Sequence, residues 1–95
     1  MNERIRWDPQ KEAKLFDERG LSFRLVVEAI EDGAYVADIE HPDEKRKHQR
    51  ILLIRVNGYV CAVPYVERDG IMFLKTMYFD RRYNEVYGGP NGQES

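Results

Sequence analysis

Residues 51–79 read ILLIRVNGYVCAVPYVERDGIMFLKTMYF and contain two turn dipeptides, Asn57-Gly58 and Asp69-Gly70, each between apolar runs. Asn-Gly and Asp-Gly are the strongest short-range hairpin signals, because the common two-residue turn needs positive φ at both positions. The stretch therefore predicts an antiparallel meander of three strands, at 51–56, 59–66 and 71–79.

The two predicted turns also set the register of the meander. With two-residue loops, position 54 pairs with 61 and position 66 with 73, so Tyr78 lies on one face while Met77, Lys75 and Arg55 lie on the other. Both faces are largely apolar, and we expect the sheet to be covered on both sides. The face with Arg55 and Lys75 carries the inward-lying cations and is the better candidate for an anion site.

Pro64 interrupts this scheme, because it lies in the middle strand and has no backbone N–H to donate. Two explanations stay open. Either the missing N–H falls where the first strand has already ended, or a bulge shifts the register beyond Pro64 and moves Lys75 to the other face.

The chain before the meander predicts a short strand and a capped helix. Residues 3–7 alternate between polar and apolar side chains, as in a strand. Asp8-Pro9 is typical of a helix start, with Asp as the N-cap and Pro in the first turn. Gly20 suits the left-handed position that follows the end of this helix near Arg19.

A second helix is predicted to follow at once. Ser22 is its expected cap and Gly33 its end. Its apolar stripe has the spacing i, i+3, i+4, i+7. The members of the stripe are Phe23, Val26, Val27 and Ile30.

The remaining segments complete an α+β fold. We expect a strand at 34–39, a charged loop at 41–49 and, after the meander, a short helix over 80–87 with Asp80 as its cap. The order is then a short N-terminal strand, two helices, a mostly antiparallel sheet and a short C-terminal helix. A single domain is expected over 1–87, with a flexible tail at 88–95.

Composition narrows the class of protein only slightly. The 95 residues include 15 Lys and Arg against 17 Asp and Glu, for a net charge of −2. Nucleic-acid binders are usually basic, but five cations and no acid lie between Lys45 and Arg55. The single cysteine, Cys61, is expected to be a buried thiol. No membrane span or signal peptide is expected, and the cytoplasm is the predicted location.

Several short motifs, in their order and spacing, resemble the BrnT toxins, a branch of the RelE-like fold of toxin–antitoxin ribonucleases. The motifs are Ile5-Arg6-Trp7-Asp8-Pro9-Gln10-Lys11, Gly20-Leu21-Ser22-Phe23, Arg50-Ile51-Leu52-Leu53-Ile54, Tyr65-Val66-Glu67-Arg68 and the segment from Phe73 to Tyr87. The resemblance covers residues 4–87. It implies a toxin of a type II toxin–antitoxin system, held in check by a small DNA-binding antitoxin, as a homodimer or a toxin–antitoxin hetero-oligomer.

The resemblance also implies metal-independent RNA cleavage, in which the 2′-hydroxyl attacks the adjacent phosphate. That reaction needs a proton acceptor, a proton donor and cations for the phosphorane charge, and no cofactor. The candidate catalytic residues are Lys75, Arg81, His48 and Tyr78. The candidate RNA-binding residues are Arg50, Arg55, Arg82 and Tyr83. His48 is preferred to His41 because it adjoins the strand that carries Arg50 and Arg55.

Each candidate residue also has a purely structural interpretation, with the cations solvated and the tyrosines in the core. The family usually has Lys-His-Gly where this chain has Glu18-Arg19-Gly20, and Met72 and Met77 lie near positions where arginines are usual. These departures support an alternative function, a non-catalytic interaction or RNA-binding domain that keeps the fold.

Overall fold

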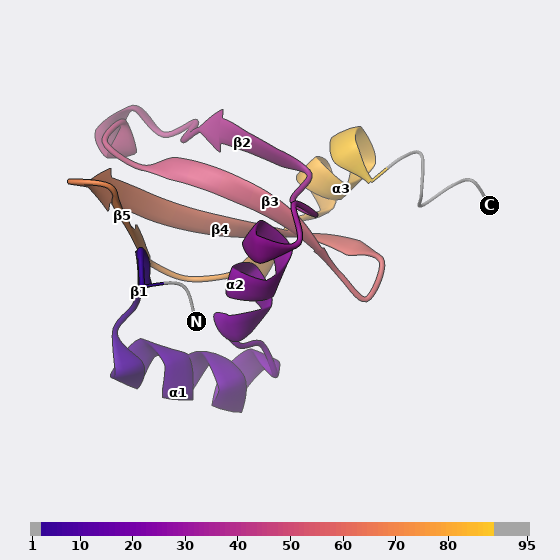
Figure 1. Cartoon of the computed structure of the whole chain (residues 1–95). Helices are drawn as coiled ribbons and strands as arrows, with labels where there is room; N and C mark the ends of the chain where they lie inside the picture. The colour runs from indigo at the N-terminus through magenta and orange to yellow at the C-terminus, as the bar shows by residue number, and fades with distance from the viewer. Residues whose placement is uncertain (1–2, 89–95) are drawn as a thin grey trace.

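The computed structural model describes residues 3–88, which form a six-stranded sheet with helices on both faces (Figure 1). The predicted α+β fold and the order of its parts are confirmed. In chain order the elements are β1 (Ile5–Arg6), α1 (Pro9–Arg19), α2 (Arg24–Glu31), β2 (Ala37–Glu40), a 3₁₀ turn (Glu44–Arg46), β3 (Arg50–Val56), β4 (Tyr59–Arg68), β5 (Ile71–Leu74), β6 (Tyr78–Phe79) and α3 (Arg81–Tyr87).

The sheet has the strand order β1-β5-β4-β3-β2, and β6 pairs with β4 beyond the end of β5. Among residues 3–88, β1 runs parallel to its neighbour β5 and the other strand pairs are antiparallel. Both hairpin turns are as predicted, with φ of 55° at Asn57 and at Asp69 and positive φ at the glycine after each. The predicted pairs 54–61 and 66–73 are also confirmed.

The predicted strand at 71–79 is wrong as a single strand, because it breaks after Leu74. The N–H of Lys75 still donates to the carbonyl oxygen of Pro64 at 2.9 Å. Proline cannot return the bond, so the ladder stops there. Pairing resumes with Tyr78 opposite Ala62, a register shifted by one residue. Residues 75–77, which we call the sheet break, therefore face only residues 63 and 64, as in a bulge.

The sheet break corrects the predicted faces of two side chains. Met77 is completely buried in the core beneath α1 and α2, on the face predicted for Tyr78. Tyr78 instead packs with Tyr83 and Tyr87 of α3 on the opposite face. One extra residue reverses the alternation of every side chain that follows it.

The first helix begins and ends where the sequence predicts. The Asp8 carboxylate accepts the Gln10 N–H at 2.9 Å, and Gly20 has φ of 68° after the last turn. The second helix starts at Arg24, whose N–H donates to the Ser22 hydroxyl. Glu12 of α1 joins the two helices, since its carboxylate accepts the Ser22 O–H and the backbone N–H at position 23.

Two cores lie on the two faces of the sheet, as predicted from its two apolar faces. The larger one packs α1 and α2 against the sheet and contains Cys61 and the tilted ring pair of Trp7 and Phe23. Cys61 has no exposed surface, and burial raises the pKa of its thiol to about 12. The smaller core lies between the sheet and α3.

Some element boundaries differ by a few residues from the predicted ones. The strand predicted at 34–39 is observed at Ala37–Glu40, and the charged loop at 41–49 contains the 3₁₀ turn. Gly88 closes α3 as its C-cap, so the rest of the predicted tail, residues 89–95, lies outside the described residues. Within residues 3–88 no helix is long and apolar enough to span a membrane.

Candidate RNA-binding clefts at the sheet break

Helix α1 meets the sheet at the break and supplies cations to its free carbonyl groups. The Lys11 ammonium donates to the Lys75 carbonyl oxygen at 3.4 Å, the position left open by Pro64. About two turns further along α1, the Arg19 guanidinium donates to the Met77 carbonyl oxygen at 2.7 Å. A carbonyl group has no net charge, so both cations keep their positive charge at this place.

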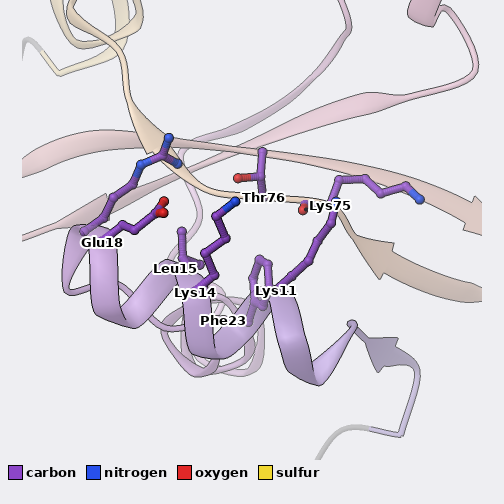
Figure 2. Close-up of a pocket in the computed structure, with 8 residues that line it drawn as sticks. Lys11, Lys14, Leu15, Glu18, Phe23, Lys75 and Thr76 are labelled. Atoms are coloured by element: carbon purple, nitrogen blue, oxygen red, sulfur yellow. Dashed lines mark hydrogen bonds between the residues drawn. The ribbon is translucent and has the colours of Figure 1, made fainter.

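A shallow hollow of about 220 Å³, the α1 cleft, lies between α1 and the sheet break. Figure 2 shows Lys11 and Lys14 on the side of α1 that faces Lys75 and Thr76. Glu18 is the acidic residue among the lining side chains. The α1 cleft is therefore bordered mainly by cations and suits an anion.

A larger hollow of about 520 Å³, the His41 cleft, adjoins the same break. Its volume is within the range usual for small-ligand sites. It is lined by Lys11, Lys75, Arg46, His41, Gln49 and Tyr78. Pro64 and Thr76 complete the wall, so no carboxylate side chain among residues 3–88 lines it.

Two side chains of the His41 cleft are suited to donate hydrogen bonds. The Nδ1 atom of His41 accepts the Asp43 N–H at 3.1 Å, which assigns the proton of the neutral imidazole to Nε2. Burial, with a smaller effect of Tyr83 beside it, raises the pKa of Tyr78. The Tyr78 phenol is thus protonated at neutral pH and serves as a donor rather than a base.

A third hollow of about 360 Å³, the Phe73 cleft, is lined by His48, Gln49, Val66, Arg68, Phe73 and Lys75. Lys75 borders all three clefts, and Gln49 borders the second and third. The structure thus brings three of the four candidate catalytic residues, Lys75, His48 and Tyr78, to adjoining hollows around one lysine.

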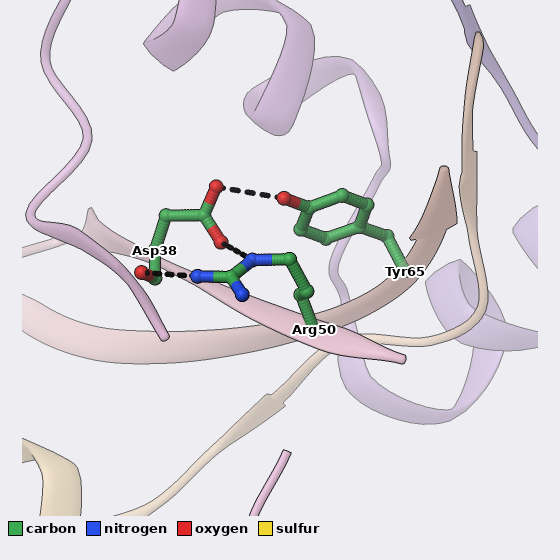
Figure 3. Close-up of polar contacts among 3 residues, drawn as sticks. All are labelled: Asp38, Arg50 and Tyr65. Carbon is green, nitrogen blue, oxygen red and sulfur yellow. Dashed lines mark hydrogen bonds and ion pairs between the residues drawn. The ribbon is translucent and has the colours of Figure 1, made fainter. Parts of the chain in front are cut away.

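The candidate RNA-binding residue Arg50 lies outside these three clefts, in a partly exposed network on β3 (Figure 3), and borders a separate hollow with two glutamates, Glu40 and Glu44. Its Nε donates to the Asp38 carboxylate at 2.9 Å and its Nη2 to the Asp38 carbonyl oxygen at 2.9 Å. The Tyr65 hydroxyl donates to the other carboxylate oxygen at 2.7 Å. The bond and charge of Asp38 raise the pKa of Arg50. Burial, and then Asp38, raises the pKa of Tyr65.

Four other candidate residues gather around α3. Arg82 pairs with Asp80 at 3.1 Å, and its hydrogen bond lowers the pKa of that carboxyl group. Tyr83 packs in the smaller core, and Arg81 is exposed at the start of α3 and lines none of the three clefts.

The fourth of these residues, Arg55, closes the other end of α3. Its Nη2 donates to the Tyr87 carbonyl oxygen at 3.2 Å. Arg55 pairs with Val60 of β4, whereas Lys75 bonds to Pro64 of the same strand. Val60 and Pro64 are four residues apart, which is about 13 Å along a strand. Arg55 therefore lines none of the three clefts that Lys75 borders, and the anion site predicted on the face of Arg55 and Lys75 stays a prediction.

The structure adds residues that the sequence interpretation missed. Lys11, Lys14 and Glu18 follow the helical spacing i, i+3, i+7, a pattern that could have placed them on one face of α1. The sequence ranks His41 below His48 and gives Gln49 no role. Both lie in the irregular loop at 41–49, where no periodicity predicts which side chains meet the sheet.

The comparisons with known proteins leave the family open, because no protein-family model, no curated protein and no solved structure matches the chain. Within residues 3–88, no group of three or more His, Cys, Asp and Glu side chains is placed to hold a metal ion.

Proposed function

We propose that this protein is an RNA-cleaving toxin with BrnT-like motifs, a metal-independent endoribonuclease that acts at the His41 cleft. One observation carries the proposal: two lysines, an imidazole and a protonated phenol border a single hollow that is free of carboxylates among residues 3–88. Such a set attracts a phosphodiester and stabilises the negative charge of a phosphorane.

The proposed reaction forms a bond between the 2′-oxygen and phosphorus and breaks the bond from phosphorus to the 5′-oxygen. His48, which borders the adjoining Phe73 cleft, takes the proton of the 2′-hydroxyl and later releases it to solvent. Tyr78 gives its proton to the departing 5′-oxygen and regains one from solvent. Lys11, Lys75 and the Nε2–H of His41 bind the phosphoryl oxygens, whose charge grows in the transition state. The products are a 2′,3′-cyclic phosphate and a 5′-hydroxyl.

The test is cleavage of an end-labelled single-stranded RNA by the purified protein in the presence of EDTA. We expect a 2′,3′-cyclic phosphate at the cut, and no cut where the attacking nucleotide is 2′-deoxy. Lys75→Ala should lower the rate about 10²–10³-fold. Arg24→Ala removes an exposed cation of α2 outside the clefts and is the matched control. If micromolar protein cuts no RNA, the nuclease proposal is wrong.

The proposed partner is a small DNA-binding antitoxin, and the proposed place of action is the cytoplasm, where the RNA is. This part rests on the resemblance to BrnT toxins. Induced expression of the chain alone should arrest growth with loss of RNA, and Lys75→Ala should relieve the arrest. A small reading frame for a ribbon-helix-helix protein beside the gene would support the pairing. Harmless expression without any antitoxin would contradict it.

A second candidate function is RNA binding without cleavage. Met72 and Met77 lie near positions where the BrnT toxins usually have arginines, and this favours it, because cleavage needs cations to stabilise the phosphorane charge. The same assay separates the two functions. A binder retains labelled RNA on a filter in a Lys75-dependent way and leaves it intact.

A further inference from the structure

Gln49 is an unusual side chain at the junction of the His41 and Phe73 clefts. It is only 9% exposed, and its side-chain amide makes no hydrogen bond with any of residues 3–88. Its backbone N–H is satisfied by the Arg46 carbonyl oxygen at 2.8 Å. A nearly buried amide without a protein partner is uncommon, because losing water without a replacement bond costs free energy.

The side-chain amide of Gln49 is nearly buried but can still be reached from the His41 and Phe73 clefts, which the residue borders. Among the described residues, the one fully enclosed side-chain polar atom without a partner is a nitrogen of Arg55. The Gln49 amide is therefore not sealed in, and the residue borders both clefts that meet at Lys75. One donor group and one acceptor group thus lie next to the proposed phosphate site.

Phe73 provides an apolar surface beside this amide. Its side chain is 39% exposed on β5, in a cleft that it shares with Arg68, His48 and Lys75. Its backbone is held by pairing with Val66, so the ring stands on a regular strand. An exposed aromatic ring among cations is the usual platform on which proteins stack a single-stranded base.

We propose that the Phe73 cleft is a nucleobase subsite of the RNA-cleaving site, in which Phe73 stacks an unpaired adenine and Gln49 reads its edge. The glutamine amide accepts from the N6 amino group and donates to a ring nitrogen, the pairing that Gln makes with adenine. This subsite rests on the proposed function and adds its specificity. Arg68 and Lys75 hold the phosphates on either side of the base.

The test uses single-stranded RNA oligonucleotides that differ at one position and are otherwise uridine. For the wild type we expect faster cleavage, by about 10–100-fold, when that position is adenine and next to the cut. Gln49→Met keeps the length of the side chain but removes its amide, and should reduce the preference below about threefold. Gln49→Glu leaves only an acceptor, and should shift the preference to cytosine, whose N4 amino group donates.

Variants of Phe73 distinguish stacking of the base on the Phe73 ring from recognition of the base edge by the Gln49 amide. Phe73→Leu should weaken binding of all the oligonucleotides by about 10–100-fold and leave their ranking unchanged, and Phe73→Trp should retain binding. Two results would overturn the subsite but not the nuclease proposal. One is wild-type cleavage with no base preference, and the other is a wild-type adenine preference that Gln49→Met and Gln49→Glu both retain. A protein that neither binds nor cuts RNA would overturn both proposals.

Discussion

Pro64 and Tyr65 are neighbours in β4, yet they lie in two regions that differ in the partners of their cations. Tyr65 belongs to the network of Arg50 and Asp38, and Pro64 lies opposite the sheet break. On the Tyr65 side, the charge of Arg50 is met by the Asp38 carboxylate. On the Pro64 side, Lys11 bonds to a backbone carbonyl group and keeps its charge. We expect the partner of a cation, rather than its position in a basic stretch, to decide whether the cation is available to a phosphate.

The largest expected effect belongs to the lysines of the sheet break. The double variant Lys11→Ala/Lys75→Ala should lower RNA cleavage about 10³-fold, because both ammonium groups border the His41 cleft. Arg50→Ala should change it less than about threefold, since that charge is already neutralised. Single-turnover cleavage rates of the two variants and the wild type provide the measurement.

The salt dependence of RNA affinity provides an independent readout for the same pair of variants. The logarithm of the RNA association constant falls linearly with the logarithm of the salt concentration. Removing one cation that binds a phosphate should reduce the magnitude of this slope by about 0.7 for single-stranded RNA. We expect a lower slope in the lysine variant and an unchanged slope in Arg50→Ala. Equal decreases of the slope in the two variants would contradict the distinction between the regions.

The next prediction concerns Pro64 itself. Pro64→Ala restores an N–H opposite the Lys75 carbonyl oxygen, which should extend the β4–β5 ladder and displace Lys11 from that oxygen. Cleavage should fall about tenfold, because small displacements of binding groups slow catalysis. Hydrogen exchange should show a new protected amide at position 64. Unchanged cleavage together with that protected amide would mean that the break has no part in the site.

The sheet break illustrates how far the sequence alone could go. Two-residue turns have a local cause in Asn-Gly and Asp-Gly, so the meander and most of its register are predictable. The same register makes 64 and 75 a hydrogen-bonded pair. It therefore predicts that the N–H missing at Pro64 would have bonded to the last strand of the meander rather than to the first. The reversed faces of Met77 and Tyr78 follow from that failure, but only once the extra residue is located.

The site itself is less predictable than the sheet. His41, Gln49 and Arg46 reach the clefts through an irregular loop, and such positions depend on contacts that no periodic pattern encodes. Whether Arg50 meets Asp38 depends on the exact register of β2 against β3. The sequence places this strand at 34–39 instead of Ala37–Glu40 and contains no turn signal that fixes its register, so the pair is not predictable. Local turn chemistry is therefore predictable here, and the charge balance that depends on long-range register is not.

The smallest predicted effect concerns the partly exposed network on the Tyr65 side. Tyr65→Phe removes the 2.7 Å bond to Asp38 and should lower the free energy of unfolding by about 1 kcal/mol at pH 7, with cleavage unchanged. Because the folded state raises the pKa of Tyr65 above its ordinary value near 10, its contribution is complete below pH 10 and is lost as the phenol ionises above it. Denaturant titrations of the two proteins should therefore converge above pH 10, since the other tyrosines and Cys61 are common to both. A wild-type advantage that instead grows with pH would show that burial and Asp38 do not hold the Tyr65 hydroxyl in its protonated form.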